Sequence, residues 1–245
     1  MPNARKSREQ RQQAQQEDAE KHAAKRSRRI RTIGVALVVV LLVAGGAVVL
    51  SSAKKDTTAA AVSDSTSQSL PEALKSAGCG KVINVGPFLP ADTMDRSHDG
   101  LSPLQDYPSI PPASGPHAGS TVAGGPYSEA PDLASAIHSL EHGAAEIWYS
   151  PSVADSPEVV DIKDFIEQTP ENADHTIVVP YDYPDQGQYG QLPNGSTMAL
   201  VAWHNVMTCQ QPNLVVAKDF LSKYRYPPLG DGKYIGEAPE QGVAI

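Results

Sequence analysis

Apolar residues recur with helical spacing in three segments of the C-terminal two thirds of the chain. Residues 131–143 carry an apolar stripe at positions i, i+3, i+4 and i+7, made of Leu133, Ala136, Ile137 and Leu140. Asp132 is suited to cap the N-terminus of this helix, and Gly143 to end it. Segments 156–168 and 213–225 have the same amphipathic pattern. The spacing therefore predicts three helices that each bury one face.

Three further segments have the composition of buried strands. Residues 144–150, 175–181 and 197–207 are short apolar runs rich in β-branched and aromatic residues. The predicted order is helix, strand, helix, strand, strand, helix. This order is typical of an α+β domain, and a thioredoxin-like α/β sandwich is one form it could take.

A different apolar pattern lies near the N-terminus. Residues 32–53 contain no charged side chain, and a bilayer-spanning helix needs about 20 such residues. The preceding 31 residues carry a net charge of +6, whereas the chain from residue 56 onward carries −16. Basic residues favour the cytoplasmic side. We therefore expect a single-pass anchor at the cell membrane with the N-terminus cytoplasmic; a cleaved signal peptide is the alternative.

This pattern divides the chain into four parts. Residues 1–31 form a basic cytoplasmic arm, 32–53 a transmembrane helix, 54–70 a flexible linker and 71–245 one extracytoplasmic domain. The basic cluster at 25–31 is suited to anionic lipid headgroups, so we expect the lipid bilayer as a partner and no nucleic acid. Protein partners in the envelope are not identified by these patterns.

The two cysteines, Cys79 and Cys209, both lie in the outer domain. An even pair in an oxidising compartment predicts a disulfide. A pair of thiols for redox or copper chemistry is the alternative, although no C-x-x-C is present.

Candidate chemistry lies at the end of the first predicted helix, in the sequence H-S-L-E-H. His138 and His142 lie one helical turn apart on a face away from the apolar stripe. An inverted-zincin protease uses the same H-x-x-E-H pattern, with Glu141 as the general base. Such an enzyme also needs a distant acidic ligand, for which Asp219 and Glu237 are the candidates. No second domain for holding a peptide is evident, so the sequence favours a non-enzymatic role.

Metal binding without proteolysis needs neither a general base nor a domain that holds a peptide. His117 follows a proline-rich loop and His98 lies upstream of it, so both could join the helix histidines. Histidine-rich ligation suits Zn²⁺ or Cu²⁺. The alternatives are a structural or interaction role, with the imidazoles bonded to loop carbonyls, and a hydrolase that uses Ser114 or the H-x-x-E-H motif.

Several short motifs occur in a characteristic order along the outer domain. They are G-C at Cys79, His98, Y-P-x-x-P-P-A-S-G-P-H ending at His117, G-x-Y at Tyr127, H-S-L-E-H-G, A-W at Trp203, Cys209 and A-P-E at 238–240. This order resembles the actinobacterial membrane proteins of domain-of-unknown-function family 3105. The resemblance implies a membrane-anchored extracytoplasmic domain and no established activity. His204 stands where the family usually has glycine, so the resemblance assigns it no functional role.

Overall fold

The computed structural model describes residues 68–245. The predicted arm, the predicted span and all but the end of the predicted linker lie outside the described residues. Within residues 68–245, none of the helices has the length and apolar content to cross a bilayer.

The described chain is a mixed α+β structure built on a sheet of six strands, in the order β1-β6-β5-β3-β4-β2. The strands are β1 (Ile83–Asn84), β2 (Gly125–Pro126), β3 (Ala145–Tyr149), β4 (Thr176–Pro180), β5 (Met198–Ala202) and β6 (Asn205–Cys209). Strand β4 pairs in parallel with β3 and β2, whereas β3–β5, β5–β6 and β6–β1 are antiparallel. The parallel pair β3 and β4 is joined through a helix, as a parallel connection requires.

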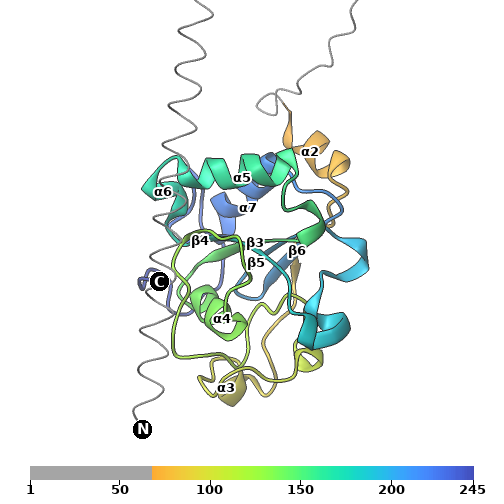
Figure 1. Ribbon diagram of the computed structural model, residues 1–245. Helices are drawn as coiled ribbons and strands as arrows, with labels where there is room; N and C mark the ends of the chain where they lie inside the picture. The colour runs from red at the N-terminus through yellow and green to blue at the C-terminus, as the bar shows by residue number, and fades with distance from the viewer. Residues whose placement is uncertain (1–67) are drawn as a thin grey trace, which may run out of the picture. The chain divides into compact units, whose positions relative to one another are not determined.

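Helices cover both faces of this sheet (Figure 1). The α-helices are α2 (Leu70–Ser76), α3 (Ala91–Met94), α4 (Leu133–Glu141), α5 (Pro157–Glu167), α6 (Pro170–Ala173) and α7 (Leu214–Tyr224). Short 3₁₀ turns lie at Leu104–Asp106, Pro151–Val153, Pro184–Gly190 and Pro193–Gly195. Helices α5 and α7 lie on one face, and α4 lies on the other with the long connections around α3.

Alternation along β3 separates two hydrophobic clusters. Ile147 and Tyr149 pack with α5 and α7, while Trp148 packs on the opposite face with α4. All three side chains are almost fully buried. Because successive strand residues point to opposite faces, this five-residue strand contributes to both layers of the core.

The helices predicted from local signals are confirmed. The Asp132 carboxylate accepts a hydrogen bond from the Ser135 amide at 2.9 Å and caps α4, which ends before Gly143 at φ +99°. Ser156 caps α5 with Pro157 at its first position, and Asn213 caps α7. Each cap satisfies amides that the first helical turn leaves without partners.

The prediction of a single strand over residues 197–207 is wrong. The segment is a hairpin in which β5 ends at Ala202, Trp203 and His204 form the turn, and β6 begins at Asn205. His204 has φ +60°, a conformation that the left-handed turn requires and that is uncommon outside glycine. No glycine marks this turn in the sequence, so the apolar run gave no sign of it.

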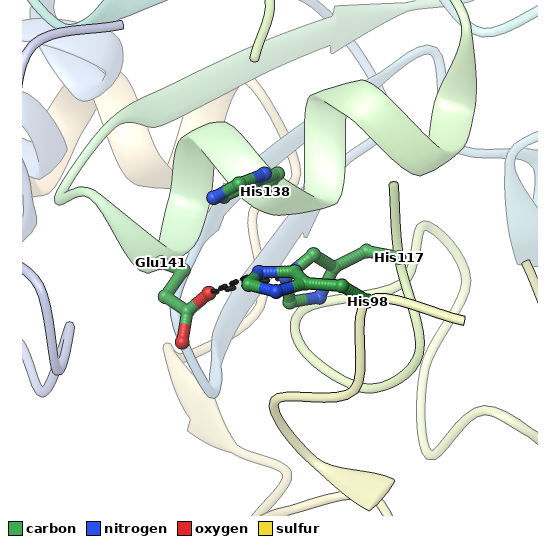
Figure 2. A group of neighbouring side chains, drawn as sticks. All are labelled: His98, His117, His138 and Glu141. Carbon is green, nitrogen blue, oxygen red and sulfur yellow. Dashed lines mark hydrogen bonds and ion pairs between the residues drawn. The ribbon is translucent and has the colours of Figure 1, made fainter. Parts of the chain in front are cut away.

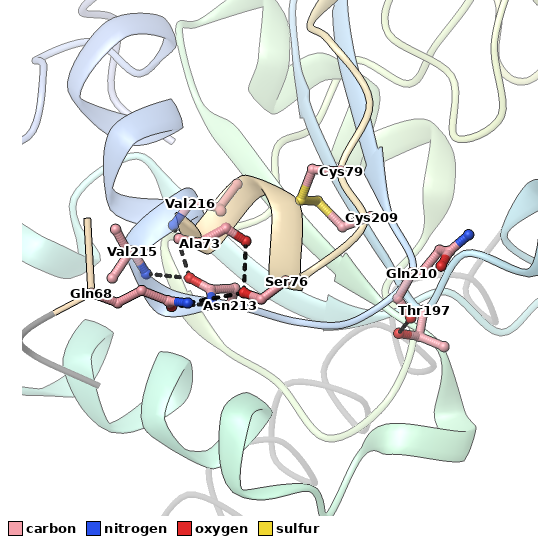
Figure 3. Close-up of a disulfide and its surroundings, with 10 residues drawn as sticks. All are labelled: Gln68, Ala73, Ser76, Cys79, Thr197, Cys209, Gln210, Asn213, Val215 and Val216. Carbon is pink, nitrogen blue, oxygen red and sulfur yellow. Dashed lines mark hydrogen bonds between the residues drawn. A yellow bond between two sulfur atoms is a disulfide. The ribbon is translucent and has the colours of Figure 1, made fainter. Parts of the chain in front are cut away.

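Cys79 and Cys209 form a disulfide across 130 residues (Figure 3). Cys79 follows α2, and Cys209 ends β6. The backbone amides of Gln210 and Gln211 also bond to the Ala77 carbonyl beside this bridge. The predicted disulfide is confirmed, and it ties helix α2 to the sheet.

We predict that loss of the disulfide destabilises the domain. Removing a cross-link of 130 residues restores chain entropy to the unfolded state, worth about 5 kcal/mol in the loop-closure treatment. A Cys79→Ser/Cys209→Ser double variant should show this loss in urea unfolding. Non-reducing peptide mass spectrometry should find the two cysteines linked in the unaltered protein, and alkylation of both native thiols would exclude the bridge.

Glu146 is an acidic residue buried in the core. It lies on the α4 side of β3, where its Oε2 accepts a 2.7 Å bond from the Trp148 indole and its Oε1 is buried with no partner among the described residues. Burial raises the pKa of Glu146 to about 8, and the bond from Trp148 offsets only part of this effect. The side chain is therefore mainly protonated at neutral pH.

The raised pKa predicts a pH-dependent loss of stability. Below pH 4.5 the carboxyl is protonated in both the folded and the unfolded chain. Between pH 4.5 and pH 8 it ionises only in the unfolded chain, so the free energy of unfolding falls by about 1.4 kcal/mol per pH unit. Glu146→Gln should therefore become more stable relative to the unaltered protein as pH rises from 5 to 8. Urea unfolding at several pH values measures this, with the exposed Glu129→Gln as the control that should show no such trend.

Candidate metal centre

Three loop or tail segments close over the polar face of α4. They are the loop after α3 that carries Arg96 and His98, the proline-rich loop ending at His117, and the C-terminal tail that carries Glu240. All nine residues of α4 are buried, including His138 and Glu141. The polar face predicted for this helix therefore looks at other parts of the chain and not at solvent.

His117 is fixed with one nitrogen directed at Glu141. Its Nδ1 lies 2.7 Å from the Gly115 carbonyl oxygen, which can only accept, so we assign the ring hydrogen to Nδ1. In a neutral ring Nε2 then carries a lone pair, 3.0 Å from the Glu141 Oε2 (Figure 2). A lone pair facing a carboxylate oxygen is repulsive unless a proton or a metal ion lies between them.

His98 and His138 complete the group around Glu141. The His98 Nε2 lies 3.5 Å from the Glu141 Oε2, and its ring centroid is 4.7 Å from that of His138. The Nδ1 atom of His138 is buried with no hydrogen-bond partner among the described residues. Burial lowers the pKa of His138, and the neighbouring imidazoles lower it further. His138 is thus a neutral imidazole, the form that binds metals.

These four side chains can converge on one ion. One donor atom from each of His98, His117, His138 and Glu141 lies within 4.8 Å of the others. A tetrahedral zinc site with bonds of about 2.0–2.1 Å separates its ligand atoms by about 3.3 Å. The separations of 3.0 and 3.5 Å at Glu141 are close to that value.

Both oxygens of Glu141 have partners. Arg96 donates to Oε1, while His117 and His98 face Oε2. Burial alone would raise the pKa of Glu141, but the bonds from His117 and Arg96 lower it to about 2. This anionic, fully buried carboxylate is better placed as a metal ligand than as a general base, because no oxygen is left free to position a water molecule.

His142 belongs to a second group. It follows α4 as its C-cap, and with His138 and Glu240 it offers three donor atoms within 4.8 Å of one another. The structure thus separates the two predicted helix ligands: His138 belongs to both groups, whereas His142 lies with the C-terminal tail.

A buried polar cluster beside the site holds the loop that carries Arg96 and His98. Asp95 accepts a 2.6 Å bond from the Ser114 hydroxyl, and its other oxygen contacts the His204 ring at 2.9 Å. Burial would lower the pKa of His204, but the hydrogen bonds that its ring donates to Asp95 and Glu237 raise it. Ser114 contacts the carboxylate and not an imidazole, an arrangement that fits loop support better than a nucleophile.

The acidic residues proposed from sequence as distant ligands lie elsewhere. Asp219 pairs with Lys223, and Glu237 contacts His204. The acid at the cluster is Glu240, which sequence reasoning missed, together with Arg96. The A-P-E motif at 238–240 was the available signal for Glu240. The available signal for Arg96 was its rarity, since residues 68–245 contain only one other arginine, Arg225.

A family model described as "protein of unknown function (DUF3105)" matches residues 102–238. The chain belongs to this family. The resemblance inferred from the motifs is therefore confirmed, while an actinobacterial origin and a membrane anchor stay predictions. His117, the helix histidines and Glu141 lie inside the matched residues; Arg96, His98 and Glu240 lie outside them. No curated protein and no solved structure matched the chain.

Proposed function

We propose that this DUF3105 domain binds a transition-metal ion through His98, His117, His138 and Glu141. The observation that carries the proposal is the contact between His117 and Glu141, in which an imidazole nitrogen lies 3.0 Å from a buried carboxylate oxygen while the other ring nitrogen bonds to a carbonyl. A metal ion between these two atoms would bond to both. The buried, unpaired Nδ1 of His138 supports the same conclusion.

Zn²⁺ and Cu²⁺ are the ions we propose. Three imidazoles and one carboxylate offer nitrogen and oxygen donors of the kind that both ions accept, and the described residues bring no thiolate to the cluster because both cysteines are in the disulfide. The Gly115 carbonyl and Arg96 would act as outer partners that orient His117 and Glu141.

A structural role is the second candidate, and the contacts of Arg96 favour it. Its guanidinium pairs with both Glu141 and Glu240 and offsets part of their charge. A domain of this kind would serve the cell envelope as a non-catalytic interaction module. The metal experiment below separates the two candidates.

We also propose a thioredoxin-like α/β sandwich for the fold and an extracytoplasmic position for the domain. The parallel unit β3–α5–β4, followed by the β5–β6 hairpin and α7 on the α5 face, supports the fold. The disulfide supports an oxidising compartment. The apolar, uncharged residues 32–53 would anchor the chain.

The metal proposal predicts uptake that depends on His98. The full-length chain, purified in mild detergent and freed of metal, should bind Zn²⁺ in calorimetry and elemental analysis, and bound metal should raise its melting temperature by mass action. His98→Ala should weaken binding by at least about 100-fold, since even losing an outer partner of a metal ligand costs 10–100-fold. Its side chain is half-exposed, so the fold should survive.

His22→Ala is the matched control, because it removes a histidine of the predicted arm and should leave binding unchanged. Affinity should also fall below about pH 6.5 as protons compete for imidazole nitrogens. Absence of Zn²⁺ and Cu²⁺ binding at neutral pH would leave the structural role.

The predicted membrane orientation leads to opposite results for two reporters fused after Ile245. A reporter enzyme that works only in the cytoplasm should be silent, because the basic arm retains the N-terminus inside. A reporter that needs an oxidising compartment should be active. The reverse pattern would overturn the orientation, and a mature N-terminus beyond residue 53 would overturn the uncleaved anchor.

A further inference from the structure

The metal-binding cluster contains the same set of donors twice. Each set consists of two imidazoles and one carboxylate, a combination that holds divalent transition metals with open positions left over. The first set is His98, His117 and Glu141, and the second is His138, His142 and Glu240. The second set has a geometry of its own that the proposed function does not use.

His142 is oriented toward Glu240 in the way that His117 is oriented toward Glu141. Its Nδ1 lies 3.0 Å from the Ala244 carbonyl oxygen, so the ring hydrogen is on Nδ1. The Nε2 atom lies 3.5 Å from the Glu240 Oε2. A second imidazole nitrogen thus faces a second carboxylate oxygen, and a metal ion between them would bond to both.

Arg96 holds the two carboxylates in matching positions. Its Nε donates to the Oε1 of Glu141 and its Nη2 to the Oε1 of Glu240. The Oε2 atom of each carboxylate is left to face an imidazole. Because one rigid guanidinium contacts both acids, it holds the two carboxylates close to each other.

The backbone also favours a cation at this end of α4. The C-terminal tail is bonded to the helix end, with the Glu240 amide on the Glu141 carbonyl and the Gly242 amide on the His142 carbonyl, both at 3.0 Å. These bonds fix Glu240 beside the helix terminus, whose partial negative charge attracts cations.

We infer that the cluster is a dinuclear centre, with a second ion held by His138, His142 and Glu240. The inference rests on the proposed function, because the first ion occupies the neighbouring set. His138 lies within reach of both sets but has one lone pair when neutral. It therefore binds the first ion when that ion is alone and turns to the second when both are present. Water would fill the coordination positions that these side chains leave open.

The two ions should differ in affinity. The centre already contains Arg96, and two carboxylates do not balance two divalent ions and a guanidinium. We expect the second ion to bind at least tenfold more weakly than the first, since it enters a site that carries an excess of positive charge.

Titration of the metal-free, full-length chain with Zn²⁺ tests this. Calorimetry and elemental analysis should give two ions per chain, and Glu240→Gln and His142→Ala should each bind one ion with the first affinity retained. Glu237→Gln is the matched control, since this carboxylate lies in the same tail but contacts Asn84 and His204. It should bind two ions. With Cu²⁺, the mononuclear electron paramagnetic resonance signal should grow during the first equivalent and then fall during the second, because adjacent ions couple.

Each contrary result identifies which of the two proposals is wrong. One ion at saturation, lost in His98→Ala, would overturn the dinuclear centre and leave the single-ion function standing. Two ions that persist in both Glu240→Gln and His142→Ala, or a Cu²⁺ signal that doubles, would place the second ion elsewhere and overturn the inference. Absence of any binding would overturn both proposals together.

Discussion

The structure around the site depends on the burial of α4 on all sides. Its apolar stripe packs on the sheet beside Trp148, and none of its nine residues reaches solvent to any large extent. Two imidazoles and a carboxylate at one helix end must then be enclosed as well. A polar group buried without a partner costs several kcal/mol, so the covering segments have to supply partners. The surrounding loops and the tail meet this requirement with carbonyls, imidazoles and one guanidinium.

Arg96 explains how such a cluster persists without an ion. The described domain is strongly acidic, and its few basic side chains are dispersed, yet one of its two arginines spans the two carboxylates beside the histidines. Structural zinc modules commonly unfold without metal because nothing else balances their ligands. Here the guanidinium pairs with both carboxylates and offsets part of their charge, and the hydrophobic clusters on both faces of the sheet supply the stability. Metal binding would therefore act on a folded, preorganised domain, which reduces the ordering that binding requires.

The features predicted correctly from sequence are those that local residues determine. The helical spacing of apolar residues predicted three helices, which Asp132, Ser156 and Asn213 cap in the structure. The even number of cysteines and their predicted compartment indicated the disulfide. The hairpin turn was missed because a histidine with positive φ occupies it instead of a glycine, and the contacts of His204 with Asp95 and Glu237 join residues far apart in sequence. No periodicity contains that information.

In the candidate site, too, local motifs could be predicted and contacts between distant segments could not. The four histidines were identified from their motifs, but their grouping depends on segments more than 100 residues apart: Arg96 meets Glu240 across 144 positions. Sequence reasoning treated His138 and His142 as one pair because they share a helix face. In the folded chain, His138 belongs both to the group around Glu141 and to the group around Glu240, whereas His142 belongs to the second group alone.

This division changes the interpretation of the H-x-x-E-H sequence. In a protease of the inverted-zincin type, both histidines would bind one zinc ion and the glutamate would stay free to activate water. Here Glu141 lies among His98, His117 and Arg96, and His142 lies with Glu240. The i, i+3 spacing therefore directs His138 and Glu141 to one set of donors, and the i, i+4 spacing directs His138 and His142 to the other. Since both spacings lie on one helix face, the pattern is suited to holding two positions side by side, with His138 between them.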